Sequence, residues 1–145
     1  MLPAGIGHVD AEAELAVVMG RETRGVSADD ALDGVAGYLC VNDVSARDLQ
    51  FCDGQWFRGK SIDSFCPIGP EIVPVGELDD ASDLRVVQHL NGAVLQESRT
   101  SQLIFGVRDL VSFASRTITL LPGDLILTGT PSGVGVFRSP KVSLH

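Results

Sequence analysis

The sequence predicts a strand-rich α+β domain with short helices. Hydrophobic residues make up 44% of the 145 residues and charged residues 21%, a composition that can build a core and differs from that of disordered chains. The 16 glycines and 7 prolines indicate many turns and short elements rather than a helical bundle. Short apolar runs bounded by turn residues recur along the chain, as is typical of strands. The length fits a single domain over residues 1–145.

Two apolar runs in the first half of the chain predict strands, at residues 14–19 and 38–44. The second run hardly alternates with polar residues, so we expect it to be buried on both faces. Between the two runs, Ser27 with Asp30 three positions later is a capping-box pattern that predicts a short helix. The segment 45–70 is rich in polar, aromatic and glycine residues, and we expect a long irregular loop there.

A β-hairpin is the clearest local prediction in the second half, because an Asn-Gly pair at 91–92 separates two strand-like runs within residues 84–98. Apolar residues at helical spacing then predict one amphipathic helix between residues 101 and 115. Residues 118–128 have the pattern of a strand, a Pro-Gly turn and a second strand. A glycine-rich loop follows at 129–135.

The charge balance excludes several classes of partner. Eleven Lys and Arg residues against 19 Asp and Glu residues give a net charge of -8, which disfavours nucleic acids and anionic lipid surfaces. No apolar run approaches the roughly 20 residues of a membrane span, and the first residues lack a signal-peptide pattern. The expected location is cytoplasmic.

The three cysteines give no sign of a metal site or a disulfide. Cys40, Cys52 and Cys66 lack metal-site or paired spacing and are predicted to be free thiols.

Acidic residues at alternate positions form the first candidate site. Asp10, Glu12 and Glu14 would project from one face of a strand, where their mutual repulsion favours a bound cation. Carboxylate oxygens suit Mg²⁺, Ca²⁺ or Mn²⁺. The alternative is a solvated acidic edge strand. Asp43, at the end of an apolar strand, either joins the same site or caps the following turn.

Two loops form the second group of candidates. The sequence GQWFRGKS at 54–61 matches a phosphate-binding loop, but no buried strand precedes it, so we reject that function. Lys60, flanked by glycine, is predicted to contact an anion, with a solvated surface lysine as the alternative. The loop TGTPSGVG at 128–135 presents backbone N–H groups and the Thr130 hydroxyl to a carboxylate, or else forms a simple turn.

Five blocks of sequence, in this order and spacing, resemble the fumarylacetoacetate hydrolase family. They are EAEL at 12–15, NDVSARDLQ at 42–50, GKSIDSFCPIGP at 59–70, LNGAVLQESRTS at 90–101 and LLPGDLILTGTPSGVG at 120–135. The resemblance covers nearly the whole chain and implies a mixed β roll or sandwich with short flanking helices, assembled as a homodimer. It also implies a partial catalytic domain, truncated at both ends relative to other members.

The resemblance further implies which side chains form the site. The metal ligands are Glu12, Glu14 and Asp43, which would bind Mg²⁺, or alternatively Mn²⁺ or Ca²⁺. The catalytic residue that supports the charge of the substrate is Lys60. The residues that contact the oxo-acid are Arg47, Gln50 and Thr130.

The activity implied by the resemblance is metal-dependent hydrolysis of C–C bonds in short 2-oxo or 1,3-diketo acids, of the acylpyruvate or fumarylacetoacetate type. A metal-stabilised enolate would carry this reaction. The same site also suits a tautomerase, isomerase or decarboxylase of 2-oxo acids, such as oxaloacetate or 2-hydroxyhepta-2,4-diene-1,7-dioate. A third possibility is a catalytically inert, metal-binding fragment.

Overall fold

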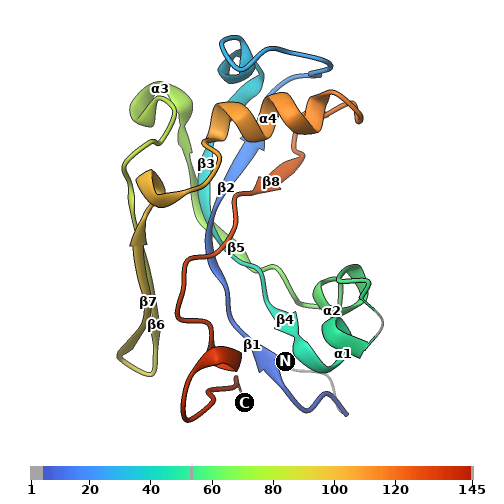
Figure 1. Ribbon diagram of the computed structural model, residues 1–145. Coiled ribbons are helices and arrows are strands. Elements are labelled where there is room, and N and C mark those ends of the chain that lie inside the picture. The colour runs from blue at the N-terminus through green and yellow to red at the C-terminus, as the bar shows by residue number, and fades with distance from the viewer. Residues whose placement is uncertain (1–4, 53, 145) are drawn as a thin grey trace.

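The computed structural model describes residues 5–52 and 54–144. An antiparallel four-stranded sheet in the order β5-β3-β2-β8 forms its centre (Figure 1). The sheet consists of β2 (Ala13–Met19), β3 (Val35–Asn42), β5 (Ile68–Pro74) and β8 (Leu125–Leu127). Two strand pairs flank it, β1 (Val9–Asp10) with β4 (Ser45–Ala46) and β6 (Arg85–Leu90) with β7 (Ala93–Arg99). The strand-rich α+β fold is confirmed.

Short helices connect and cover these strands. The α-helices are α1 (Arg47–Cys52), α2 (Phe57–Lys60), α3 (Val75–Leu78) and α4 (Val107–Ser115). Single 3₁₀ turns lie at η1 (Ala31–Gly34), η2 (Thr100–Gln102) and η3 (Gly135–Phe137). In Figure 1, α4 crosses the upper part of the sheet, whereas α1 and α2 lie beside β4 at the lower end. No helix in the described part of the chain is long and apolar enough to cross a bilayer.

Strand β2 is buried along most of its length because apolar side chains cover both of its faces. Alternate residues of a strand point to opposite faces. Leu15, Val17 and Met19 pack in the larger core cluster, which also includes side chains of α4. Ala16 and Val18 pack on the other face with apolar side chains of β3. The central strand is therefore fixed in its register from both sides.

Several local predictions are confirmed. The strand at 14–19 lies in β2, and residues 38–42 of the strand predicted at 38–44 lie in β3, which ends at Asn42. Strands β6 and β7 form the predicted hairpin, in which Asn91 adopts the positive φ of 50° that its turn requires. The capping pattern is also present, since Asp30 N donates to Ser27 Oγ at 3.2 Å, although only a 3₁₀ turn follows.

Other local predictions are wrong. The segment 45–70 is not one irregular loop, because it contains β4, α1, α2 and the start of β5. Helix α4 begins only at Val107, since Leu103 is extended and Gly106 forms the N-cap. The first of the two strands within 118–128 is reduced to a single bridge between Leu120 and Thr23.

The prediction for the cysteines is confirmed, because Cys40, Cys52 and Cys66 form no disulfide and are free thiols.

The stability of the fold should depend strongly on Met19, whose side chain is 1% exposed in the larger core cluster. Replacing Met19 by alanine leaves a cavity and should lower the free energy of unfolding by about 2–5 kcal/mol. Ile118→Ala, at a site that is 56% exposed, should change it by less than about 0.5 kcal/mol. Urea denaturation of both variants measures this difference, and equal losses would contradict the assigned core.

Candidate active site

Three carboxylates from two separate segments converge at the lower end of the central sheet. The antiparallel register pairs Ala13 with Asn42, which places Glu12 opposite Asp43. The backbone confirms this arrangement, because Asp43 N donates to the Glu12 carbonyl at 2.9 Å. Glu12, Glu14 and Asp43 each offer an oxygen, and these oxygens lie within 4.8 Å of one another. The predicted ligand set is thus brought together by strand pairing.

The carboxyl group of Glu14 has a raised pKa. Burial raises its pKa to about 7, and the neighbouring charges of Asp43 and Glu12 act in the same direction. The backbone N–H of Gly129 donates to Glu14 Oε2 at 2.6 Å and, together with the charge of Lys60, partly offsets this rise. A cation bound to this carboxylate would favour its charged form, so the site is suited to one.

Lys60 lies over the acidic cluster because α2 packs closely against β4 and α1. Gly59 permits this approach, since a Cβ there would come within 2.9 Å of Ala46 O and Gln50 N. Lys60 Nζ donates to Glu12 Oε2 at 2.8 Å and also to Asp43 Oδ2. Burial lowers the pKa of Lys60, but its bonds to these two carboxylates outweigh burial and raise the pKa above its usual value. Lys60 is therefore an ammonium ion at neutral pH.

Arg47, the first residue of α1, extends this network away from the acidic cluster. Its Nη1 lies 2.7 Å from Glu12 Oε1 and donates to Gln50 Oε1 at 2.8 Å. Its Nη2 donates to Asp10 Oδ2 at 2.9 Å. Positive and negative groups thus alternate from Asp10 through Arg47, Glu12 and Lys60 to Asp43. Such pairing offsets the cost of burying these charges.

The donor set fits a divalent cation. Carboxylate oxygens are hard ligands of the kind that Mg²⁺, Mn²⁺ and Ca²⁺ prefer. Glu12 and Glu14 are buried and Asp43 is partly buried, so their repulsion is poorly screened by water. Burial and the two other acids raise the pKa of Glu14, so a positive charge bound nearby would stabilise its ionised form.

One cavity of about 750 Å³ adjoins the cluster and is lined by all seven residues predicted from the sequence. They are Glu12, Glu14, Asp43, Arg47, Gln50, Lys60 and Thr130. Apolar side chains line much of the remaining wall, including those of Phe51, Trp56, Leu127, Val134 and Phe137. The structure brings the predicted residues together, and their individual roles remain predictions.

Thr130 is held by contacts that the sequence did not indicate. Its hydroxyl donates to the Ala13 carbonyl at 3.0 Å and accepts a bond from Gln96 Nε2 at 2.8 Å. Gln96, which is 1% exposed on β7, also accepts a bond from Ala13 N at 2.9 Å. The hairpin is thereby tied to the start of β2. A buried glutamine in a strand that otherwise resembles a surface hairpin gives no recognisable sequence signal.

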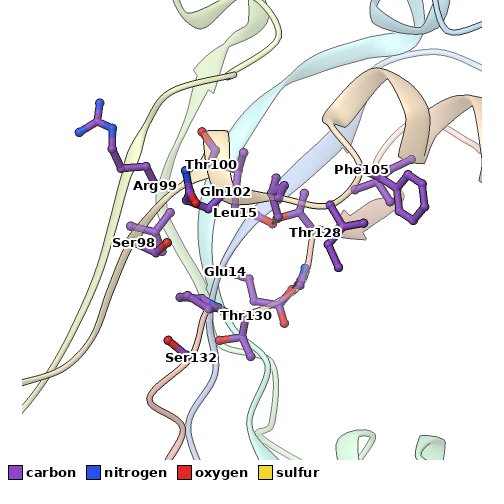
Figure 2. A pocket seen from close by; sticks show the side chains of 16 residues that line it. Glu14, Leu15, Ser98, Arg99, Thr100, Gln102, Phe105, Thr128, Thr130 and Ser132 are labelled. Atoms are coloured by element: carbon purple, nitrogen blue, oxygen red, sulfur yellow. Dashed lines mark hydrogen bonds between the residues drawn. The ribbon is translucent and has the colours of Figure 1, made fainter.

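A second cavity, of about 580 Å³, is also lined by residues 129–132 of the glycine-rich loop. Figure 2 shows Glu14, Thr128 and Thr130 at its centre, between Ser98 on the hairpin and Phe105 before α4. Glu14 and Thr130 line both cavities. The loop that follows β8 therefore contributes to both cavities, and so does Glu14.

Asp10 is placed differently from the sequence expectation. Its alternate spacing with Glu12 and Glu14 predicted one carboxylate cluster, but the ligand cluster of the described residues contains only those two and Asp43. β1 ends at Asp10 and β2 begins at Ala13, so the strand periodicity is interrupted between them. The Asp10 carboxylate contacts Arg47 instead.

Comparison with known proteins identifies related chains. A mitochondrial oxaloacetate tautomerase from Rattus norvegicus is 44% identical over 145 residues, covering 99% of this chain and 46% of that protein. The solved structure of 2-hydroxyhepta-2,4-diene-1,7-dioate isomerase from Mycobacterium marinum is 54% identical, with a TM-score of 0.88, over 92% of this chain and 52% of that one.

A fumarylpyruvate hydrolase from Pseudomonas aeruginosa, solved in complex with Mn²⁺ and pyruvate, is also similar. It is 34% identical, with a TM-score of 0.87, over 92% of this chain and 58% of that one. The chain thus spans about half the length of the rat tautomerase and of the two solved proteins described here.

A sequence model of the fumarylacetoacetate hydrolase C-terminal domain matches the entire chain, residues 1–145. The relatives and the solved structures agree with this match in both sequence and fold. The chain belongs to the fumarylacetoacetate hydrolase family, within its C-terminal domain.

Proposed function

We propose that this chain forms the metal-dependent centre of an enzyme that interconverts tautomers or double-bond isomers of short 2-oxo acids. The observation that carries the proposal is the convergence of Glu12, Glu14 and Asp43 beside Lys60 in one cavity. Related proteins named as an oxaloacetate tautomerase and a dienedioate isomerase share 44% and 54% identity with the chain. This support favours the alternative activity inferred from the sequence over the hydrolysis given there as the first expectation.

Hydrolysis of a C–C bond is the second candidate. The fumarylpyruvate hydrolase from Pseudomonas aeruginosa supports it, at 34% identity. Isomerisation and hydrolysis both require negative charge to develop on an oxo-acid oxygen, so one site can support either. Hydrolysis additionally requires an activated water, whereas isomerisation requires only the movement of a proton.

The metal-binding part of the proposal assigns Glu12, Glu14 and Asp43 as ligands for Mg²⁺, Mn²⁺ or Ca²⁺. The related hydrolase was solved in complex with Mn²⁺ and pyruvate, which supports the proposal of a divalent metal and a 2-oxo acid. A bound divalent ion supplies a Lewis acid that polarises the 2-oxo group and stabilises enolate charge.

The other side chains of the cavity supply positive charge and orientation. Lys60 presents an ammonium group beside Glu12 and Asp43, where it can donate a hydrogen bond to a substrate oxygen. Arg47 holds the Gln50 carbonyl oxygen, which turns the amide N–H₂ group of Gln50 away from Arg47. Gln50 is thereby oriented as a donor to an oxo-acid, the role predicted for it from the sequence.

Assembly and location complete the proposal. A homodimer is expected from the family resemblance, and exposed apolar side chains such as Ile104 and Phe113 are consistent with a further contact surface. The cytoplasmic location expected from the sequence is kept as part of the proposal. Size-exclusion chromatography with light scattering measures the assembly directly.

Metal binding should depend on Glu14 and Asp43. With Mg²⁺ at about 100 times its dissociation constant, the wild type should gain about 2.7 kcal/mol of stability, whereas Glu14→Gln and Asp43→Asn should gain almost none. Differential scanning calorimetry with and without Mg²⁺ measures these gains. Asp83→Asn, which alters an exposed acid that pairs with Arg99, is the matched control and should keep the full gain. Unchanged metal affinity in both site variants would refute the assignment.

The activity should appear as metal-dependent loss of the enol form of oxaloacetate. Enol absorbance after dissolving the solid acid should fall faster with the chain and Mg²⁺ than with Mg²⁺ alone, and a chelator should abolish the difference. Lys60→Met should lower this rate by about 100-fold or more, because its charge stabilises the developing oxyanion. The variant should bind Mg²⁺ at least as tightly, since a cation that repels the metal is removed.

A hydrolysis assay separates the two candidate activities. Acetylpyruvate is incubated with the chain and Mg²⁺, and released pyruvate is measured with lactate dehydrogenase. Isomerisation predicts accelerated enol loss from oxaloacetate with little pyruvate from acetylpyruvate. Stoichiometric pyruvate without any effect on enol loss would replace the proposed isomerase with the hydrolase.

A further inference from the structure

Asp10 is a buried carboxylate that does not line either of the two cavities described above. The residue is 2% exposed. Its two oxygens accept five hydrogen bonds, from Ala11 N, Gly135 N and Val136 N at 2.8–2.9 Å and from Arg47 Nε and Nη2 at 3.1 and 2.9 Å. Such a fully bonded carboxylate is held in one orientation, and it holds its partners in turn.

Arg47 is the partner that connects Asp10 to the site. Nε and Nη2 of its guanidinium both point to Asp10 Oδ2, which fixes the plane of the group. Nη1 is therefore aimed in a fixed direction, where it meets Glu12 Oε1 at 2.7 Å. Since Oε1 of Glu12 is held in this way, Oε2 is the oxygen that faces Lys60 and the acidic cluster.

We propose that Asp10 is a positioning residue that acts through Arg47 to present one oxygen of Glu12 to the metal. Without the Asp10 charge, Arg47 would be an uncompensated cation beside Glu12, and it would compete with the metal for that carboxylate. The inference deepens the proposed function and rests on the metal-binding part of it. The residue itself touches neither the cavity nor the ligand cluster.

The same carboxylate also fixes the last part of the described chain. A Cβ at Gly135 would lie 2.7 Å from Asp10 Oδ1 and 2.1 Å from Val142 O, so this segment packs directly on Asp10. A purely structural role, joining β1 to residues 135–142, is therefore the competing explanation. The two explanations differ in whether the effect of Asp10 on the metal passes through Arg47.

The test is a double-mutant cycle on Mn²⁺ affinity, measured by electron paramagnetic resonance of free Mn²⁺. Asp10→Asn keeps the size of the side chain but cannot balance the charge of Arg47, and it should weaken Mn²⁺ binding about tenfold or more. Asp48→Asn, in the same helix as Arg47 and at a carboxylate that accepts a hydrogen bond from Gly7 N, is the matched control and should bind as the wild type does.

Arg47→Met completes the cycle. If Asp10 acts through Arg47, adding Asp10→Asn to Arg47→Met should change Mn²⁺ affinity by less than about twofold. An undiminished loss in the Arg47→Met background would assign Asp10 a structural role and overturn the proposal. Unchanged affinity in the single Asp10→Asn variant would overturn it as well.

A second variant keeps the proposal testable if Asp10→Asn does not fold. Arg47→Lys retains the charge but lacks the fork that joins Asp10 to Glu12, so it should weaken Mn²⁺ binding in the same way. Wild-type affinity in Arg47→Lys would overturn the proposal. Because the readout is affinity, a wild type that binds Mn²⁺ without isomerase activity refutes only the proposed function. A wild type that binds no Mn²⁺ refutes the metal centre and this inference together.

Discussion

The antiparallel register between β2 and β3 is the constraint on which the candidate site depends. Pairing of Ala13 with Asn42 sets Glu12 opposite Asp43, and the next residue but one, Glu14, completes the cluster. A slip of one residue would turn side chains of β2 to the opposite face. Apolar packing on both faces of β2 opposes such a slip, so the core that stabilises the fold also sets the positions of the ligands.

Charge compensation is the second requirement of this geometry. Buried carboxylates are costly unless cations and hydrogen bonds satisfy them. Lys60 and Arg47 compensate Glu12 and Asp43, whereas Glu14 receives a backbone N–H and keeps a pKa raised to about 7 by burial. The compensation comes from α1 and α2, short helices that hold their cations over one end of the sheet. Removing a carboxylate, a cation or a helix contact would therefore disturb the whole network.

The sequence alone predicts the parts of the molecule that depend on local chemistry. The Asn-Gly turn, the apolar run of β2 and the spacing of Glu12 and Glu14 are local, and the structure agrees with each. Helices α1 and α2 were missed because four to six residues give no helical periodicity and their packing relies on the close approach at Gly59. Arg47, which pairs with Asp10, is 37 residues away along the chain, a contact that no local pattern indicates.

The most direct test of the proposed metal centre is the anomalous scattering of Mn²⁺ in crystals of the chain grown with that ion. We expect one strong anomalous peak within coordination distance of an oxygen from each of Glu12, Glu14 and Asp43, the cluster whose oxygens lie within 4.8 Å of one another. A fully ordered structure with no peak there at saturating Mn²⁺, or with these carboxylates turned apart, would contradict it.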